Sequence, residues 1–160
     1  MLALVSLVLA SGCGGTSSSE SPPAVGKAFA ARATAVCERA LGSKQRWSAF
    51  PVQNFDPANP DPNALPKVAV WLDGQVAPVL TAWLAGLKGL GLPSTGAKPW
   101  SNVLAAVAKI DQSNADQIAA ARAGDAARFA AATTTGRSTN IELKQATAAA
   151  GVPKCADVHS

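Results

Sequence analysis

The residues of this chain that could do chemistry are few and widely spaced. Cysteines stand at Cys13, Cys37 and Cys155, and the one histidine among 160 residues is His159. No CxxC pair occurs, whereas structural zinc sites need several Cys or His ligands at short spacings. We therefore expect no metal site and no cofactor.

The acidic residues are isolated as well. Asp111 and Asp116 are five positions apart, a spacing that places two side chains poorly for joint work on one helical face. General acid–base catalysis needs a titratable group positioned in a pocket, and the sequence has neither a nucleophile-elbow serine nor a Gly-rich loop after a strand. We expect no enzymatic activity. An enzyme would need a cluster of polar side chains that the sequence pattern does not predict.

The N-terminal segment has the features of an export signal. Residues 2–10 form an apolar run that is too short to span a bilayer as a helix. Ser11 and Gly12 follow, then Cys13, and Ala10 stands three positions before the cysteine. This arrangement resembles the lipobox of bacterial lipoproteins.

The lipobox resemblance implies that Cys13 is acylated, for instance with palmitate, and becomes the mature N-terminus. Several acyl chains on one residue give stable anchoring. The alternative is an ordinary secretory signal with a chance cysteine. We expect a signal peptide over residues 1–12, a lipidated Gly/Ser/Pro-rich tether over 13–26 and a helical domain over 27–160. The domain would lie on the extracytoplasmic face of the cell membrane, held by the lipid at Cys13.

Lipidation of Cys13 leaves two cysteines in an exported domain. Disulfides persist in extracytoplasmic compartments, so we predict a bond between Cys37 and Cys155. Cys37 falls on the apolar face of the first expected helix.

Four amphipathic helices are predicted, because apolar residues recur at three and four positions. They cover residues 25–48, 66–90, 98–123 and 125–150. Mostly short connections favour an all-α, antiparallel four-helix bundle. The Pro78 ring would crowd the carbonyl of Gly74, which predicts a kink in the second helix.

Two segments are harder to interpret. Residues 68–92 are apolar enough for a membrane span, but Asp73, Gln75 and Lys88 favour a buried bundle helix. In the fourth helix, residues 133–136 have low helical propensity. A straight fourth helix would leave Cys155 far from Cys37, so either the tail turns back along the bundle or this helix bends.

Residues 49–66 form a long loop with five prolines. Phe50, Val52 and Phe55 indicate that this loop packs onto the domain. Loops of this length are functional or disordered in compact domains; this one is either a binding surface or a crossover over the bundle end. On the third helix, Asn114 is the one polar member of the apolar stripe and would need hydrogen-bond partners or a ligand.

Charge excludes one class of partner. The net charge is +4, and the 14 Lys and Arg residues are scattered without a basic run. We therefore expect no nucleic-acid partner; weak attraction to anionic lipid headgroups is compatible with this charge.

The chain as a whole resembles small, Ala-rich actinobacterial lipoproteins. These share the lipobox, the Gly/Ser tether, an Ala-x-x-x-Cys pattern (Ala33 to Cys37) and a terminal Gly-hydrophobic-x-x-Cys pattern (Gly151 to Cys155). The group has no assigned activity, so the resemblance implies location and fold only.

Two functions follow as hypotheses. The first is a non-catalytic binding or envelope-structural module with a protein or envelope partner. The second is a carrier of an apolar small molecule or lipid, since small alanines opposite Trp71, Trp83 and Trp100 could leave interior space.

Overall fold

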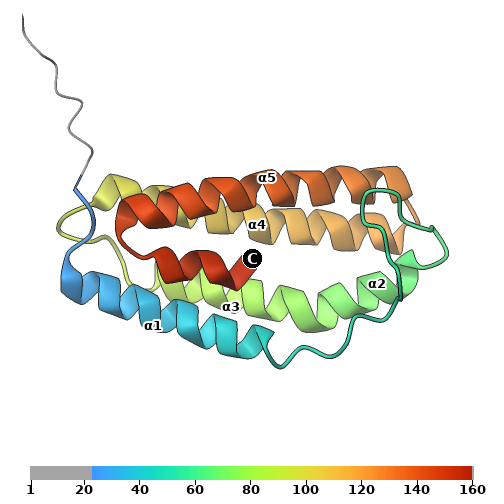
Figure 1. The fold of residues 1–160 in the computed structure, drawn as a ribbon, viewed down its shortest axis with the longest axis horizontal. Helices are drawn as coiled ribbons and strands as arrows, with labels where there is room; N and C mark the ends of the chain where they lie inside the picture. The colour runs from blue at the N-terminus through green and yellow to red at the C-terminus, as the bar shows by residue number, and fades with distance from the viewer. Residues whose placement is uncertain (1–22, 160) are drawn as a thin grey trace, which may run out of the picture.

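The computed structural model describes residues 23–159, and this part of the chain is helical without any strand (Figure 1). The fold class is therefore all-α, as predicted. The elements are α1 (Lys27–Lys44), α2 (Leu65–Trp71), the π-helical turn η1 (Leu72–Val76), α3 (Ala77–Lys88), α4 (Ala97–Arg122), α5 (Ala126–Ala150) and the 3₁₀ segment η2 (Pro153–His159).

The helices lie lengthwise along one another. In Figure 1, α4 and α5 form one side of the molecule, α1 and the α2–η1–α3 run form the other, and η2 lies between them. Each main helix buries one stripe of apolar side chains, and burial of this surface is the main favourable term in folding. The largest fully buried side chains include Trp83, Trp100, Leu65, Leu80, Leu87, Ile110 and Leu143.

Close contact between α4 and α5 depends on small residues. A Cβ at Gly136 would lie 3.0 Å from Ser113 Oγ, so this position has no room for an ordinary side chain. Ser113 Oγ in turn donates a hydrogen bond to the Ala132 carbonyl over 2.8 Å. The buried hydroxyl is thus satisfied by the neighbouring helix.

The second predicted helix is a continuous helical run from Leu65 to Lys88, with a π-helical turn just before Pro78. The Ala77 N–H bonds to the Leu72 carbonyl, an i to i+5 pairing. Pro78 has no N–H, and its ring crowds the carbonyl four residues earlier. The wider turn accommodates this proline where we had expected a kink.

By length and composition alone this same run could cross a membrane. Its most apolar 18 residues have a mean hydropathy of 1.3, and 33% of these residues are buried. It was the one such helix among residues 23–159. Its buried side chains join the common core, among them Leu65, Leu72, Leu80, Trp83 and Leu87. This supports the interpretation as a core helix.

The predicted weak point of α5 is not a break. The helix runs without interruption through residues 133–136 to Ala150. The chain then reverses at Gly151, whose φ of 75° suits glycine, and the Val152 N–H bonds to the Thr147 carbonyl. Of the two arrangements that the cysteines allowed, the tail turning back is the one that occurs.

The long loop packs onto the domain, as predicted. Phe50 contacts Trp71 and Phe55 with ring centroids 5.1 and 5.3 Å apart, and Phe55 reaches Phe129 at 5.8 Å. Asp56 and Asp61 each accept a backbone N–H from two residues later at 2.9 Å, which forms a turn at each position.

The residues just before α1 also contact the domain. Val25 is buried, and its N–H donates to the Ala150 carbonyl over 3.2 Å. Cys13 and the signal segment lie outside the described residues.

Candidate functional site

A disulfide fixes the segment that forms the candidate site. Cys37 and Cys155 are bonded, with Cα atoms 5.0 Å apart and a sequence separation of 118. This confirms the predicted pairing. Both cysteines are fully buried, and their bond attaches η2 to the middle of α1.

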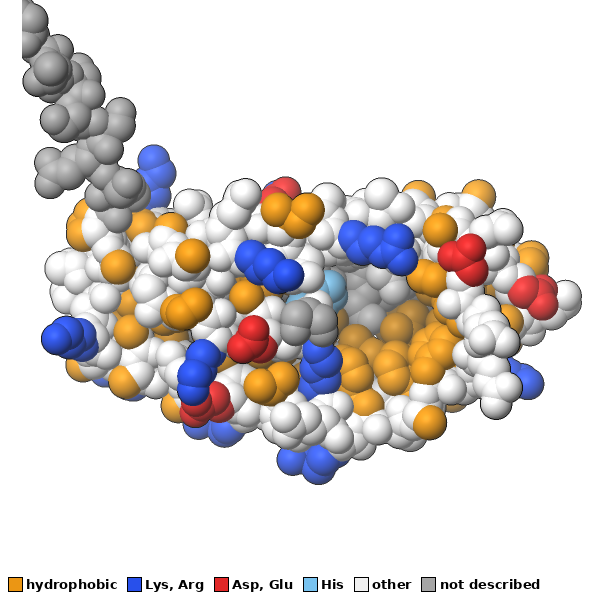
Figure 2. All heavy atoms as spheres, viewed as in Figure 1, with side chains coloured by type: hydrophobic (Ala, Val, Ile, Leu, Met, Phe, Trp, Pro, Cys, Tyr) orange, Lys and Arg blue, Asp and Glu red, His pale blue; other side chains and the backbone are white. Residues whose placement is uncertain are grey.

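A groove of about 200 Å³ opens where η2 ends, at the C-terminal end of α1. Figure 2 shows the face of the molecule hollowed beside the single histidine, with hydrophobic side chains on the floor of the hollow. Since one water occupies about 30 Å³ of liquid, the groove has room for a small organic group. It is lined by Lys44, Trp47, Leu72, Val76, Leu80, Ile110, Ser113, Asn114, Gln117, Val158 and His159.

Each wall of the groove comes from a different element. The π-helical turn contributes Leu72 and Val76, and α4 contributes Ile110 and the polar residues that follow it. π-helical turns occur often at functional sites. Here the turn that accommodates Pro78 is also the apolar wall of the groove.

Two polar atoms of the groove residues are buried without a hydrogen-bond partner among residues 23–159. They are Nε1 of Trp47 and Nδ1 of His159. Burying a polar group without a hydrogen bond costs about 1–3 kcal/mol by mutational measures. Both atoms have almost no accessible surface in this conformation, so a ligand's polar group reaches them only when the Trp47 or His159 ring turns toward the groove.

Burial also sets the protonation of the site. It lowers the pKa of His159, and the positive charge of Lys44 lowers it further. Burial likewise lowers the pKa of Lys44, against the opposing charge of Asp157. At pH 7 the His159 imidazole is accordingly neutral, with one ring nitrogen that donates and one that accepts.

Of the residues singled out from the sequence, Asn114 lies in the groove wall and is only 6% exposed. The sequence reasoning missed Lys44, Trp47 and His159, because none of them follows an apolar period. The predicted disulfide could have indicated that Lys44 and His159 lie close together. Cys37 to Lys44 covers about 10 Å of α-helix and Cys155 to His159 about 8 Å of 3₁₀ helix, so parallel segments from one bond bring these ends together.

The tryptophans do not leave the interior space that the carrier hypothesis expected beside them. Trp83 and Trp100 are fully buried, and their indole N–H groups donate to Cys37 Sγ and the Gly91 carbonyl at 3.3 and 3.1 Å. The Trp71 N–H donates to the Ser48 carbonyl at 3.2 Å. These three rings fill and brace the core, and the groove lies beside Trp47 instead.

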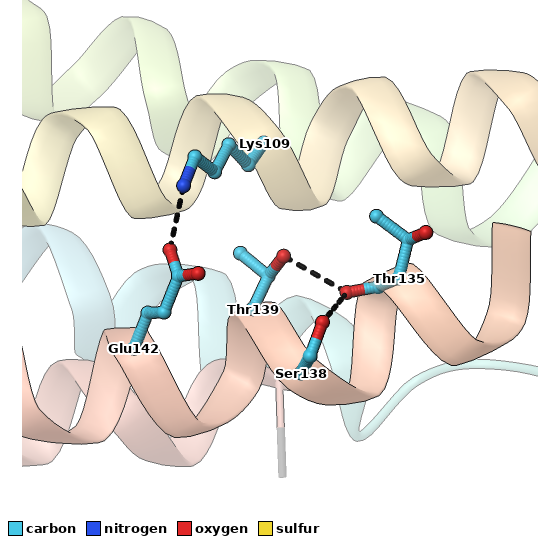
Figure 3. A network of polar contacts seen from close by, with 5 residues as sticks. All are labelled: Lys109, Thr135, Ser138, Thr139 and Glu142. Carbon is cyan, nitrogen blue, oxygen red and sulfur yellow. Dashed lines mark hydrogen bonds and ion pairs between the residues drawn. The ribbon is translucent and has the colours of Figure 1, made fainter.

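The polar contacts between α4 and α5 are structural. Figure 3 shows Lys109 Nζ 2.7 Å from Glu142 Oε2 across the two helices, while Ser138 and Thr139 donate to the Thr135 carbonyl within α5. The ion pair is exposed, and such pairs contribute about 0–1 kcal/mol. It links the helices without forming a reactive pair.

The acidic residues singled out from the sequence also have structural neighbours. Asp73 pairs with Arg122 at 2.8 Å, and Asp111 accepts a hydrogen bond from Thr81 at 3.3 Å. Within the described range, no three Cys, His, Asp or Glu side chains come together as a metal site would require. The groove can bind a ligand with an apolar body and a hydrogen-bonding group.

Comparison with known proteins found no match to this chain among sequence families, curated proteins or solved structures.

Proposed function

We propose that this chain is a lipid-anchored module of the extracytoplasmic membrane face that binds its partner without catalysis. The observation that carries the binding role is an apolar groove lined by two residues with unpaired buried polar atoms, Trp47 and His159. The proposed architecture is an antiparallel four-helix bundle in which α2, η1 and α3 together form the second helix. An envelope-structural role with a protein or polymer partner belongs to the same proposal.

The groove favours one occupant over a large partner: a small molecule with an apolar body and a polar acceptor group. Leu72, Leu80 and Ile110 supply apolar surface, and each buried CH₂ contributes about 0.8 kcal/mol. The Trp47 indole N–H, once its ring turns toward the groove, supplies a donor for the acceptor group. The carrier role is therefore proposed for this surface groove and not for the bundle interior, where the tryptophans fill the core.

Native mass spectrometry of the purified protein tests this first, since a carried lipid adds its mass. Titration with decanoate and with decane-1-ol, followed by NMR shifts of groove residues, measures the binding directly. Trp47→Phe keeps an aromatic side chain but removes the indole N–H donor, so we expect about 5–10-fold weaker decanoate binding. Trp100→Phe is the matched control, because it removes an indole N–H that donates to the Gly91 carbonyl and does not line the groove. Shifts scattered over the surface, or equal loss in both variants, would contradict the groove as the site.

The anchor has its own test. With Cys13→Ala, or with globomycin, we expect the signal segment to remain uncut and a palmitate analogue to leave the chain unlabelled. The unmodified chain should partition with the membrane. Unchanged processing with release into the medium would instead establish an ordinary secretory signal.

The partner form of the proposal is tested by cross-linking the anchored protein on cells. A protein or envelope polymer recovered with the chain, and lost when the groove is occupied by decanoate, would link that partner to the groove. Recovery of no partner would restrict the function to small ligands.

A further inference from the structure

The end of the domain where the N-terminal segment enters is formed by three elements. The Val25 N–H bonds to the Ala150 carbonyl, and a Cβ at Gly96 would lie 2.6 Å from Val25 N. The start of α1, the turn between α3 and α4, and the end of α5 therefore meet here (Figure 1). We call this surface the tether end.

Folding gathers lysines at the tether end that are scattered in the sequence. Lys27 begins α1, Lys88 ends α3, and Lys98 is the second residue of α4; all three are exposed. On the face drawn in Figure 2, basic side chains and no acidic ones lie at the left end, beside the incoming chain.

The first acids on α1 and α4 lie further along these helices. Glu38 is 11 residues from Lys27, or about 16 Å of helix, and Asp111 is 13 residues from Lys98, or about 20 Å. Glu38 moreover pairs with Lys154 at 3.0 Å. The charges of the three lysines are thus not offset by an acid on the same stretch of helix.

Helix dipoles add little to this field. The first turns of α1 and α4 hold no acid, but the C-termini of α3 and α5 lie at the same end, so the dipoles of the four helices oppose one another there. The lysine side chains therefore carry the positive potential of the tether end. Such a surface complements a negative one.

The tether end also exposes an apolar side chain. Leu92, in the turn between α3 and α4, is 72% exposed. Lysines around an exposed leucine are typical of protein surfaces that lie in the headgroup region of a bilayer.

We propose that the tether end docks on the anionic lipid headgroups of the membrane, with Lys27, Lys88 and Lys98 over the phosphates and Leu92 inserted between them. The inference rests on the proposed anchoring at Cys13 for the nearness of a bilayer. Pro23 follows Cys13 by ten residues, which span at most about 36 Å when extended. Docked in this way, the long axis of the domain stands away from the membrane and the groove stays open to solvent.

The test uses the mature chain from residue 13 with Cys13→Ser, so that no acyl chain contributes. We expect co-sedimentation with vesicles of 30% phosphatidylglycerol in phosphatidylcholine, and none with pure phosphatidylcholine. Each lysine near an anionic surface raises partitioning about fivefold. Lys27→Glu/Lys88→Glu/Lys98→Glu should therefore lower it by on the order of a hundredfold, and 0.5 M salt should do the same by screening.

The matched control is Lys67→Glu/Arg128→Glu/Arg137→Glu, which changes net charge equally at exposed positions away from the tether end. We expect most of the binding to remain in this control. Acids at positions 27 and 98 suit the first turn of a helix, whereas an acid at position 88 is unfavourable in the last turn of α3, so the melting temperature of the tether-end variant should change little. Equal loss in both triple variants, or binding to polyphosphate without binding to vesicles, would overturn the proposal.

The outcome is separable from the anchor itself. If Cys13 proves unmodified in cells, vesicle binding by the unacylated chain still measures the docking surface. If Cys13 is acylated and vesicle binding is absent, the anchor remains and the docking surface is refuted.

Discussion

The indole Nε1–H of Trp83 donates to Sγ of Cys37 over 3.3 Å in the interior of the domain. Both residues are only 1% exposed, and Cys37 is bonded to Cys155 of η2. The covalent link, α1 and α3 therefore form one packed unit. Because η2 forms one side of the groove, the shape of the groove depends on this unit.

Loss of the disulfide should destabilise the domain strongly. A bond between residues 118 positions apart restricts the unfolded chain. In the chain-entropy model this stabilises the folded state by up to about 5 kcal/mol. We expect a Cys37→Ala/Cys155→Ala variant to melt at a markedly lower temperature in circular dichroism, and its η2 segment to become sensitive to protease. Cys13→Ser is the control that removes a cysteine without the bond. An unchanged melting temperature in the double variant would contradict the assigned role.

Two helical glycines should respond to alanine in opposite directions. A Cβ at Gly86 would lie 2.9 Å from Cγ1 of Val36, a stiff β-branched side chain, whereas Gly42 has nothing within 4 Å. Gly86→Ala should cost about 1–3 kcal/mol through overpacking, reduced by its gain in helix propensity. Gly42→Ala should stabilise by about 0.5–1 kcal/mol. Urea unfolding measures both, and Val36→Ala should relieve the cost of Gly86→Ala; no relief would place the strain elsewhere.

The start of α5 provides a smaller test. Asp125 Oδ1 accepts the Arg128 N–H at 2.9 Å, as an N-cap does. Asp125→Ala should lower the free energy of unfolding by about 1 kcal/mol. Asp125→Asn should retain most of the stability, because asparagine caps as well. Equal losses in both variants would mean that charge, not capping, matters at this position.

Helix positions could be predicted from the local spacing of apolar residues. The disulfide could be predicted because two cysteines remain once Cys13 is assigned to the lipid. Apolar spacing located the four helical regions to within a few residues. Gly151 and Val152 are typical of a helix end and mark the end of α5. The π-helical turn had a partial signal: Pro78 indicated that the helix must deform, but not that a wider turn would absorb it. A deformation of one turn changes the backbone by too little to alter the pattern of apolar residues.

The groove could not be predicted, because it depends on where η2 lies. The seven residues of η2 are too few for a helical period, and the disulfide places His159 beside Lys44 only once the tail turns back. The continuity of α5 through Thr133 and Gly136 is likewise a tertiary effect. Gly136 packs against Ser113 of α4, and Ser113 Oγ donates to the Ala132 carbonyl, so packing between the two helices offsets the low propensity.

His159 should make stability depend on pH below about 6.5. Burial and the charge of Lys44 lower its pKa in the folded protein below the ordinary value of 6.5; Asp157, whose charge acts on Lys44, is the acid on the same segment. Below pH 6.5 the unfolded chain therefore binds more protons at this site than the folded one. Stability is fully present above pH 6.5 and falls as the pH drops toward the folded pKa.

The expected size is at most about 1 kcal/mol between pH 6.5 and 5.5, because one proton contributes about 1.4 kcal/mol per pH unit. Since this is the one histidine in the chain, His159→Gln should flatten the dependence of the free energy of unfolding on pH within that window. Urea unfolding at half-unit pH steps measures this, and an NMR titration of the imidazole should give a midpoint below 6.5. An identical slope in His159→Gln, or a midpoint above 6.5, would show that the imidazole is not held neutral beside Lys44.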